Sequence, residues 1–175
     1  MPEKGASVSR RPHAQLPDLL PRLIAFARTL IGDADRARDL VQEAAARALA
    51  ARNVPSDAPA YRAWAFKIVR NATLDELRAK HPRQHFDAEP DVDLWRFDDA
   101  YIARITVNQG LSTIAPAHRE IIALIDIAGF NYAEAAQILG VPAGTVMSRI
   151  SRARSALLEA IESSSIRPLK SSHGN

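Results

Sequence analysis

Apolar residues recur at intervals of three and four along most of the chain, which is the spacing that places them on one face of a helix. In the first half this pattern predicts three helices, at residues 16–31, from about Asp33 or Asp35 to 49, and at 58–80. Asp18 is expected to cap the first helix and Asp57 the third. The turn residues between the second and third helices predict a loop.

The helical pattern resumes in the second half after a break. Residues 81–98 have no apolar period and contain prolines and several acids, as expected of a linker. Four helices then follow, predicted at residues 99–113, 116–128, 131–139 and 145–163. Asn131 and Glu134 have the spacing of a capping box at the start of the third of these. No stretch of useful length alternates as a strand does.

These elements indicate an all-α fold with two small helical domains joined by a flexible linker. The C-terminal domain is expected to contain a helix-turn-helix. We place the first domain at residues 16–80, the linker at 81–104 and the second domain at 105–163. Residues 1–15 and 164–175 are expected to be disordered tails.

Composition narrows the classes of function. The 175 residues include no cysteine, which excludes disulfides, zinc–thiolate sites and cysteine nucleophiles. No apolar stretch follows Arg10 and Arg11 as a signal peptide would require, and no run approaches the ~18 residues of a membrane span. We therefore expect a cytoplasmic protein that has no membrane partner.

The net charge of +3 conceals an uneven distribution. Residues 61–80 hold five Lys or Arg against two acids, and residues 143–156 hold three Arg and no acid. Residues 81–100, between them, hold six acids against two Arg. Two basic helices on either side of an acidic connector are compatible with two anion-binding surfaces, although solvated helix faces alone would explain the same charges.

The last helix carries the side chains of a DNA-reading surface. Residues 131–156 have the layout of a helix-turn-helix, with a short helix, a turn containing Gly140 and a second helix. One stripe of the second helix is apolar, and the opposite stripe consists of Thr145, Ser148, Arg149 and Arg152. Hydroxyl and guanidinium groups bind base edges and phosphates in a major groove, so this stripe predicts contact with DNA.

Four blocks together resemble one family, the extracytoplasmic-function (ECF) sigma factors. Residues 144–154 resemble the family's recognition helix, and residues 129–140 the helix before it. Residues 32–43 are similar to its polymerase-binding helix, and residues 63–78 to its −10 recognition helix. The blocks follow the family's order and spacing. The opening block, residues 16–23, also resembles the general-stress sigma factors of alphaproteobacteria.

The resemblance implies a role for each surface. Three residues, Asp39, Gln42 and Glu43, would bind the clamp of core RNA polymerase. Three more, Lys67, Asn71 and Arg78, would face the opened −10 DNA, and residues 53–58 would receive a flipped-out base. The −35 element would be read by Thr145, Ser148, Arg149 and Arg152. The implied partners are core polymerase, promoter DNA and an anti-sigma factor.

Three positions qualify the resemblance. Trp64 stands where the family has a tryptophan, and the neighbouring apolar stripe favours a core position over a base-stacking one. Met147 replaces a residue that is basic in many relatives, which removes one possible phosphate contact. Ser151 replaces a bulkier residue of some relatives. The exact −35 preference is therefore not implied.

Other classes of function explain less of the sequence. No catalytic residues, cofactor or small-molecule substrate are indicated, because the glycines are scattered singly and form no phosphate-binding loop. His81 and His85 flank Pro82 in the linker without a carboxylate cluster, which argues against a metal site. A one-component helix-turn-helix repressor or activator stays open as the main alternative. A protein-binding adaptor would leave the arginine-rich last helix unexplained.

Overall fold

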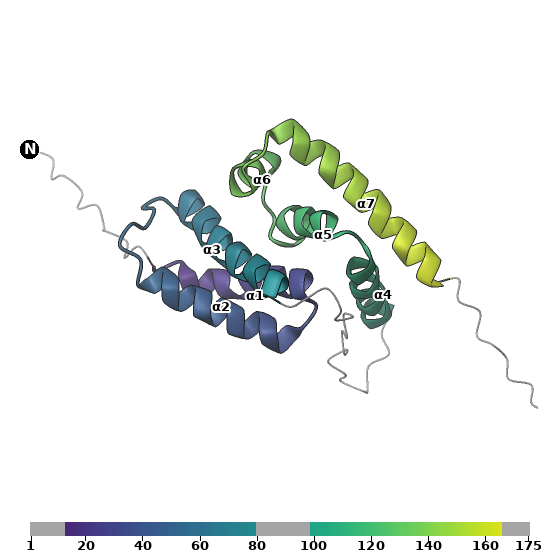
Figure 1. Cartoon of the computed structure of the whole chain (residues 1–175), viewed down its shortest axis with the longest axis horizontal. Coiled ribbons are helices and arrows are strands. Elements are labelled where there is room, and N and C mark those ends of the chain that lie inside the picture. The colour runs from purple at the N-terminus through teal and green to yellow at the C-terminus, as the bar shows by residue number, and fades with distance from the viewer. Residues whose placement is uncertain (1–12, 80–98, 166–175) are drawn as a thin grey trace, which may run out of the picture.

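The computed structural model describes residues 13–79 and 99–165 of the chain, and in these ranges every regular element is helical. The predicted all-α fold is thereby confirmed. Helices α1 to α3 lie on one side of the molecule and α4 to α7 on the other, with the long α7 along the outer edge (Figure 1). Of the predicted linker at 81–104, residues 81–98 fall outside the described residues, whereas residues 99–104 already belong to a helix. Most of both predicted tails also falls outside the described residues.

The N-terminal half is a bundle of three helices, α1 (Leu16–Ile31), α2 (Ala34–Leu49) and α3 (Ala58–Ala79). The ends of these helices lie close to the residues that the sequence predicts. Gly32 ends α1 in the left-handed conformation with a φ of 83°. The side chains of Asp33 and Asp57 accept hydrogen bonds from backbone N–H groups three residues later, each at 2.9 Å.

One predicted cap in this half is wrong. Asp18 does not cap α1, because the helix already begins at Leu16 and Asp18 lies in its first turn. Pro17 is the residue that allows the earlier start, since a proline near the first helical position lacks only an N–H that would be unpaired there anyway.

The C-terminal half contains α4 (Asp99–Thr113), α5 (Pro116–Ile122), α6 (Tyr132–Leu139) and α7 (Ala143–Ser165). The apolar helix predicted at 116–128 is α-helical only as far as Ile122. A π-helical turn, η1 (Ala123–Ile127), continues it. The predicted capping box is confirmed, with reciprocal hydrogen bonds of 2.9 and 2.8 Å between Asn131 and Glu134. Helices α6 and α7 form the predicted helix-turn-helix around Gly140, whose φ is 69°.

The two halves share one hydrophobic core, which the sequence pattern did not anticipate. Helix α1 lies against α5 and η1, and α3 lies against α6. Three aromatic rings join the halves in a row. Phe66 of α3 makes edge-to-face contacts with Phe26 of α1, at 5.4 Å between ring centroids, and with Phe130, which follows η1, at 4.9 Å. All three rings are almost fully buried, so the two halves pack directly against each other, an arrangement that we call the closed structure.

A buried arginine completes this closure. Arg119 of α5 is only 5% exposed, and its guanidinium donates to four backbone carbonyls. The acceptors are the carbonyls of Leu30, Leu111, Ser112 and Ile114. The last turns of α1 and α4 leave carbonyls without helical partners, and these helix ends carry partial negative charge. The guanidinium of Arg119 therefore donates hydrogen bonds to carbonyls at the ends of both helices. Its burial lowers the pKa of Arg119 to about 10.

We expect Arg119→Met to lower the free energy of unfolding by at least about 3 kcal/mol, because it leaves several buried carbonyls without a donor. Arg119→Lys should cause an intermediate loss, since one ammonium cannot reach all four acceptors. Urea unfolding followed by circular dichroism measures both. Arg154→Met, which removes an exposed arginine of the same half, is the control and should cost under about 1 kcal/mol. A loss of that small size for Arg119→Met would contradict the capping role.

Candidate polymerase and nucleic-acid interfaces

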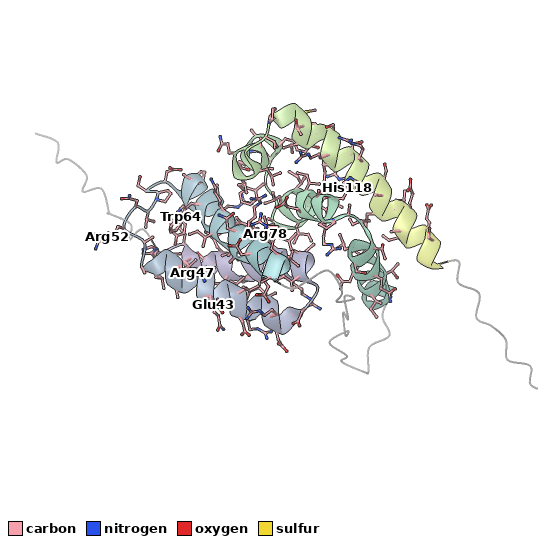
Figure 2. The ribbon with its side chains drawn as sticks, in the orientation of Figure 1. Glu43, Arg47, Arg52, Trp64, Arg78 and His118 are labelled. Atoms are coloured by element: carbon pink, nitrogen blue, oxygen red, sulfur yellow. The ribbon has the colours of Figure 1, made fainter. Side chains whose placement is uncertain are left out.

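The outer face of α2 is exposed and carries charges of both signs. Asp39, Gln42 and Glu43 all face solvent, as the helical pattern predicted. Arg47 lies 3.8 Å from Glu43 one turn later, and the two side chains are neighbours on the outside of α2 (Figure 2). Arg36 approaches the same carboxylate at 3.9 Å. The face is therefore a hydrogen-bonding surface of mixed charge and not a purely acidic one.

Helix α2 is held to α3 by a two-point ion pair. The Arg36 guanidinium donates to both carboxylate oxygens of Glu76, at 2.9 and 2.8 Å. The hydrogen bond to Glu76 is the main reason that the pKa of Arg36 is raised above its usual value. This pair fixes the outer face of α2 relative to α3, and the sequence pattern did not reveal it.

The exposed side of α3 carries the residues assigned to −10 DNA. Lys67, Asn71 and Arg78 are all exposed, so the structure places them on one open side of the helix as predicted. Arg78 lies at the C-terminal end of α3, where it donates to Asp75 at 3.0 Å (Figure 2). That pair is mostly exposed, and such pairs contribute little to stability, so the guanidinium can exchange its partner for a phosphate at small cost.

Trp64 packs against the core of the N-terminal half. Its ring lies 5.4 Å from the fully buried ring of Tyr61, and the side chain is half-buried. This agrees with the core position favoured from the sequence. Burial raises the pKa of Tyr61, whose hydroxyl lies 3.2 Å from Nδ1 of His13. The loop before α3 is largely open to solvent, and Arg52 extends outward from it (Figure 2).

The polar stripe of α7 lies on the outer side of the helix-turn-helix. Ser148 and Arg152 are exposed, whereas Thr145 and Arg149 are partly buried. Arg152 folds along its own helix and donates to the carbonyl of Ser148 at 3.2 Å. In the part of the chain that the structure describes, no carboxylate lies within ion-pair distance of Arg149 or Arg152. Both cations are thus available to an anionic partner.

The third arginine of α7 has a different environment. Arg154 donates to both oxygens of Asp126 in η1, at 2.6 and 3.2 Å, and this contact raises the pKa of Arg154. The pair joins α7 to the π-helical turn. Arg154 is therefore paired within its own half, in agreement with the sequence analysis, which left it off the stripe that holds Arg149 and Arg152.

The search for other kinds of site is negative within the described ranges. Residues 13–79 and 99–165 contain no group of three or more His, Cys, Asp or Glu arranged to hold a metal ion. None of the described helices is long and apolar enough to cross a membrane. His81 and His85 lie outside the described residues.

Comparison with known families agrees with this layout. Residues 18–83 match Sigma-70 region 2, and residues 107–157 match Sigma-70, region 4. The chain is 38% identical to the ECF RNA polymerase sigma factor EcfG of Rhodopseudomonas palustris, over 79% of this chain and 78% of that protein. The chain belongs to the ECF sigma factors of the sigma-70 family. The resemblance inferred from the four sequence blocks is confirmed.

Other sigma factors show the same relationship. SigL of Mycobacterium tuberculosis is 33% identical over 75% of this chain and 78% of its own length. Among solved structures, RpoE of Bartonella quintana, crystallised with the anti-sigma factor NepR, has a TM-score of 0.63 at 31% identity. That match covers 85% of this chain and 94% of RpoE. CnrH, in complex with the cytosolic domain of CnrY, has a TM-score of 0.67 at 26% identity over 90% and 92%.

This sigma factor therefore directs core RNA polymerase to promoters, and the alternative of a one-component regulator is not favoured. Region 2 corresponds to the half that contains α1 to α3, and region 4 to the half that contains the helix-turn-helix. The closed packing of the two regions is the feature that the sequence analysis missed. It covers a further side of α3, occupied by Arg62, Phe66 and Arg70.

Proposed function

We propose that three surfaces of this sigma factor perform three different tasks in transcription initiation. The α2 surface (Asp39, Gln42 and Glu43) binds core polymerase. The α3 surface (Lys67, Asn71 and Arg78) holds melted −10 DNA, and the α7 surface (Thr145, Ser148, Arg149 and Arg152) reads the −35 duplex. The observation that carries this proposal is that every member of the first two surfaces is exposed, as are Ser148 and Arg152 of the third.

Each surface has the chemistry that its task needs. Melted DNA is trapped by backbone charge and by capture of unstacked bases, which suits Lys67 and Asn71 beside an open loop. Duplex DNA is read by a helix whose N-terminal part enters the major groove, which suits the first turns of α7. No bond is made or broken by these side chains, so the chain acts as a regulatory subunit. Its place of action is the cytoplasm, where polymerase and promoter DNA are found.

An anti-sigma factor is the partner that regulates such a chain. RpoE and CnrH, two of the similar solved structures, were each determined with another protein, which for RpoE is the anti-sigma factor NepR. We infer that an anti-sigma factor competes with polymerase for the α2 surface or covers α7.

Run-off transcription tests the central proposal. The purified chain should support initiation only together with core polymerase, and Asp39→Arg should weaken holoenzyme assembly about tenfold because it reverses a charge on the α2 surface. Asp18→Arg, which reverses an exposed charge on α1, is the matched control and should assemble normally. Tight binding of the isolated chain to a palindrome as a dimer, with no effect on core polymerase, would overturn the assignment.

The α7 surface makes a separable prediction. Arg149→Ala and Arg152→Ala should each weaken −35 duplex binding by about 1 to 3 kcal/mol if the guanidinium reads a base, and neither should affect assembly with core. Arg154→Ala removes the same charge from the same helix but should have a smaller effect, because Asp126 already neutralises that guanidinium. Fluorescence anisotropy of holoenzyme on a −35 duplex measures this. Equal effects of all three variants would show that the stripe is misassigned.

The regulatory partner is testable in the native cell. Pull-down of the tagged chain from unstressed cells should recover a small protein in a one-to-one complex, and added core polymerase should displace it. Displacement follows from competition for one surface. Recovery of polymerase subunits alone would count against an anti-sigma factor.

A further inference from the structure

An ion pair joins the helix of the α2 surface to the helix of the α3 surface. The Arg36 guanidinium binds both carboxylate oxygens of Glu76, at 2.9 and 2.8 Å, and so connects the first turn of α2 to the last turn of α3. The Glu76 side chain is only 14% exposed, and that of Arg36 is 34% exposed. Water and salt screen a partly buried pair less than an exposed one, and two parallel hydrogen bonds fix the angle between the partners.

The apolar packing at this end of the N-terminal half is thin. Three buried residues, Ile31, Leu40 and Ala72, form a small cluster that is separate from the main core. Leu40 follows Arg36 by one helical turn, and Ala72 precedes Glu76 by one turn, so the ion pair lies next to this cluster. Because the cluster buries little apolar surface, the ion pair carries much of the link between the start of α2 and the end of α3.

The electrostatics of α2 alone do not favour an arginine at this position. The first turn of a helix carries partial positive charge, which attracts a carboxylate and repels a cation. Asp33 and Asp35 agree with that preference, and Asp33 caps the helix by accepting from the backbone N–H of Arg36 at 2.9 Å. The Arg36 side chain is therefore repelled by its own helix end and bound by a carboxylate of another helix. Its role lies in the contact with Glu76.

The pair is adjacent to residues of both functional surfaces. Nη1 of Arg36 lies 3.9 Å from the carboxylate of Glu43, which belongs to the α2 surface. The hydrogen bond to Glu76 is the main cause of the raised pKa of Arg36, and the charges of Glu43 and Asp39 raise it further. On the other helix, Arg78 of the α3 surface follows Glu76 by two residues. A movement of this pair would therefore shift the two surfaces relative to each other.

We propose that Arg36 and Glu76 are positioning residues for promoter melting. By fixing the angle between α2 and α3, they make polymerase bound at the α2 surface present the α3 surface to −10 DNA in the orientation that holds melted strands. Neither residue touches DNA, and the inference rests on the proposed roles of the two surfaces. Orientation matters because capture of the strands has to offset the cost of unstacking bases, and a small misplacement forfeits those contacts.

The first experiment measures −10 melting by holoenzyme at saturating core polymerase, so that changes in the affinity for core do not contribute. Permanganate footprinting should show that Arg36→Gln and Glu76→Gln each slow melting roughly fivefold, as expected of residues that couple two sites. Arg38→Gln is the matched control, because it removes the same charge from the same helix and its partner, Asp35, lies in α2 itself at 2.8 Å. The control should melt promoter DNA at the original rate.

A template with a pre-melted −10 region separates positioning from a loss of folded protein. A smaller fraction of folded chains would lower initiation on duplex and pre-melted templates by the same factor. A misplaced α3 lowers initiation on the duplex template alone, because the pre-melted template no longer requires strand separation. Both glutamine variants should therefore initiate on the pre-melted template at close to the original rate. Thermal unfolding of each variant sets a temperature at which all the chains are folded.

Exchanging the two charges provides a rescue. Arg36→Glu combined with Glu76→Arg rebuilds the ion pair in reverse, and it places a carboxylate in the first turn of α2, where the helix end favours one. Each single substitution breaks the pair and should melt duplex DNA at least as slowly as the glutamine variants. The combined exchange should restore melting at saturating core.

The outcomes distinguish this inference from the proposed function. Normal melting by Arg36→Gln and Glu76→Gln, equal losses on both templates, or failure of the charge exchange to restore melting would each overturn the positioning role. Those results would leave the proposed function intact, because Asp39→Arg tests core assembly and Lys67→Ala tests −10 melting directly. If Asp39→Arg assembles normally and Lys67→Ala melts DNA normally, the assignment of the two surfaces fails instead.

Discussion

The closed structure depends on one buried cation. Helix ends that point into a protein need partners for their last carbonyls, because water cannot reach them. Here α1 and α4, which come from different halves, both end beside the guanidinium of Arg119. A planar group with five N–H donors can serve two such ends at once, which an ammonium cannot do. The aromatic row of Phe26, Phe66 and Phe130 then fills the apolar space between α1, α3 and η1.

The helices could be predicted from sequence because their signals are local. Gly32, Asp33, Asp57 and Gly140 act on backbone groups within four residues, so the chain itself carries the information. The packing of the halves is a long-range property and left no such signal. Phe66, Val69 and Thr73 are buried yet lie off the apolar stripe expected for a helix that packs on one side. A helix buried on two sides loses the clear period on which sequence analysis relies.

The proposed surfaces could be predicted in part for the same reason. Helical spacing alone placed Lys67, Asn71 and Arg78 together on the open side of α3. Spacing also set Arg154 apart from the stripe that holds Arg149 and Arg152, but it could not reveal the pairing of Arg154 with Asp126, which is 28 residues away in the chain. Nor could it show that Arg70 meets Glu120, which is 50 residues distant. Which arginines form ion pairs therefore depends on where the carboxylates of other helices lie.

The composition of the contact between the halves bears on how it opens. Separation of the halves would expose apolar side chains to water, which costs free energy. Arg62, Arg70 and Glu120 would regain hydration at the same time, which offsets part of that cost. Shifting a two-state equilibrium from mostly closed to mostly open requires about 5.5 kcal/mol of preferential binding. Core polymerase and DNA supply it only through contacts that exist in the open form alone.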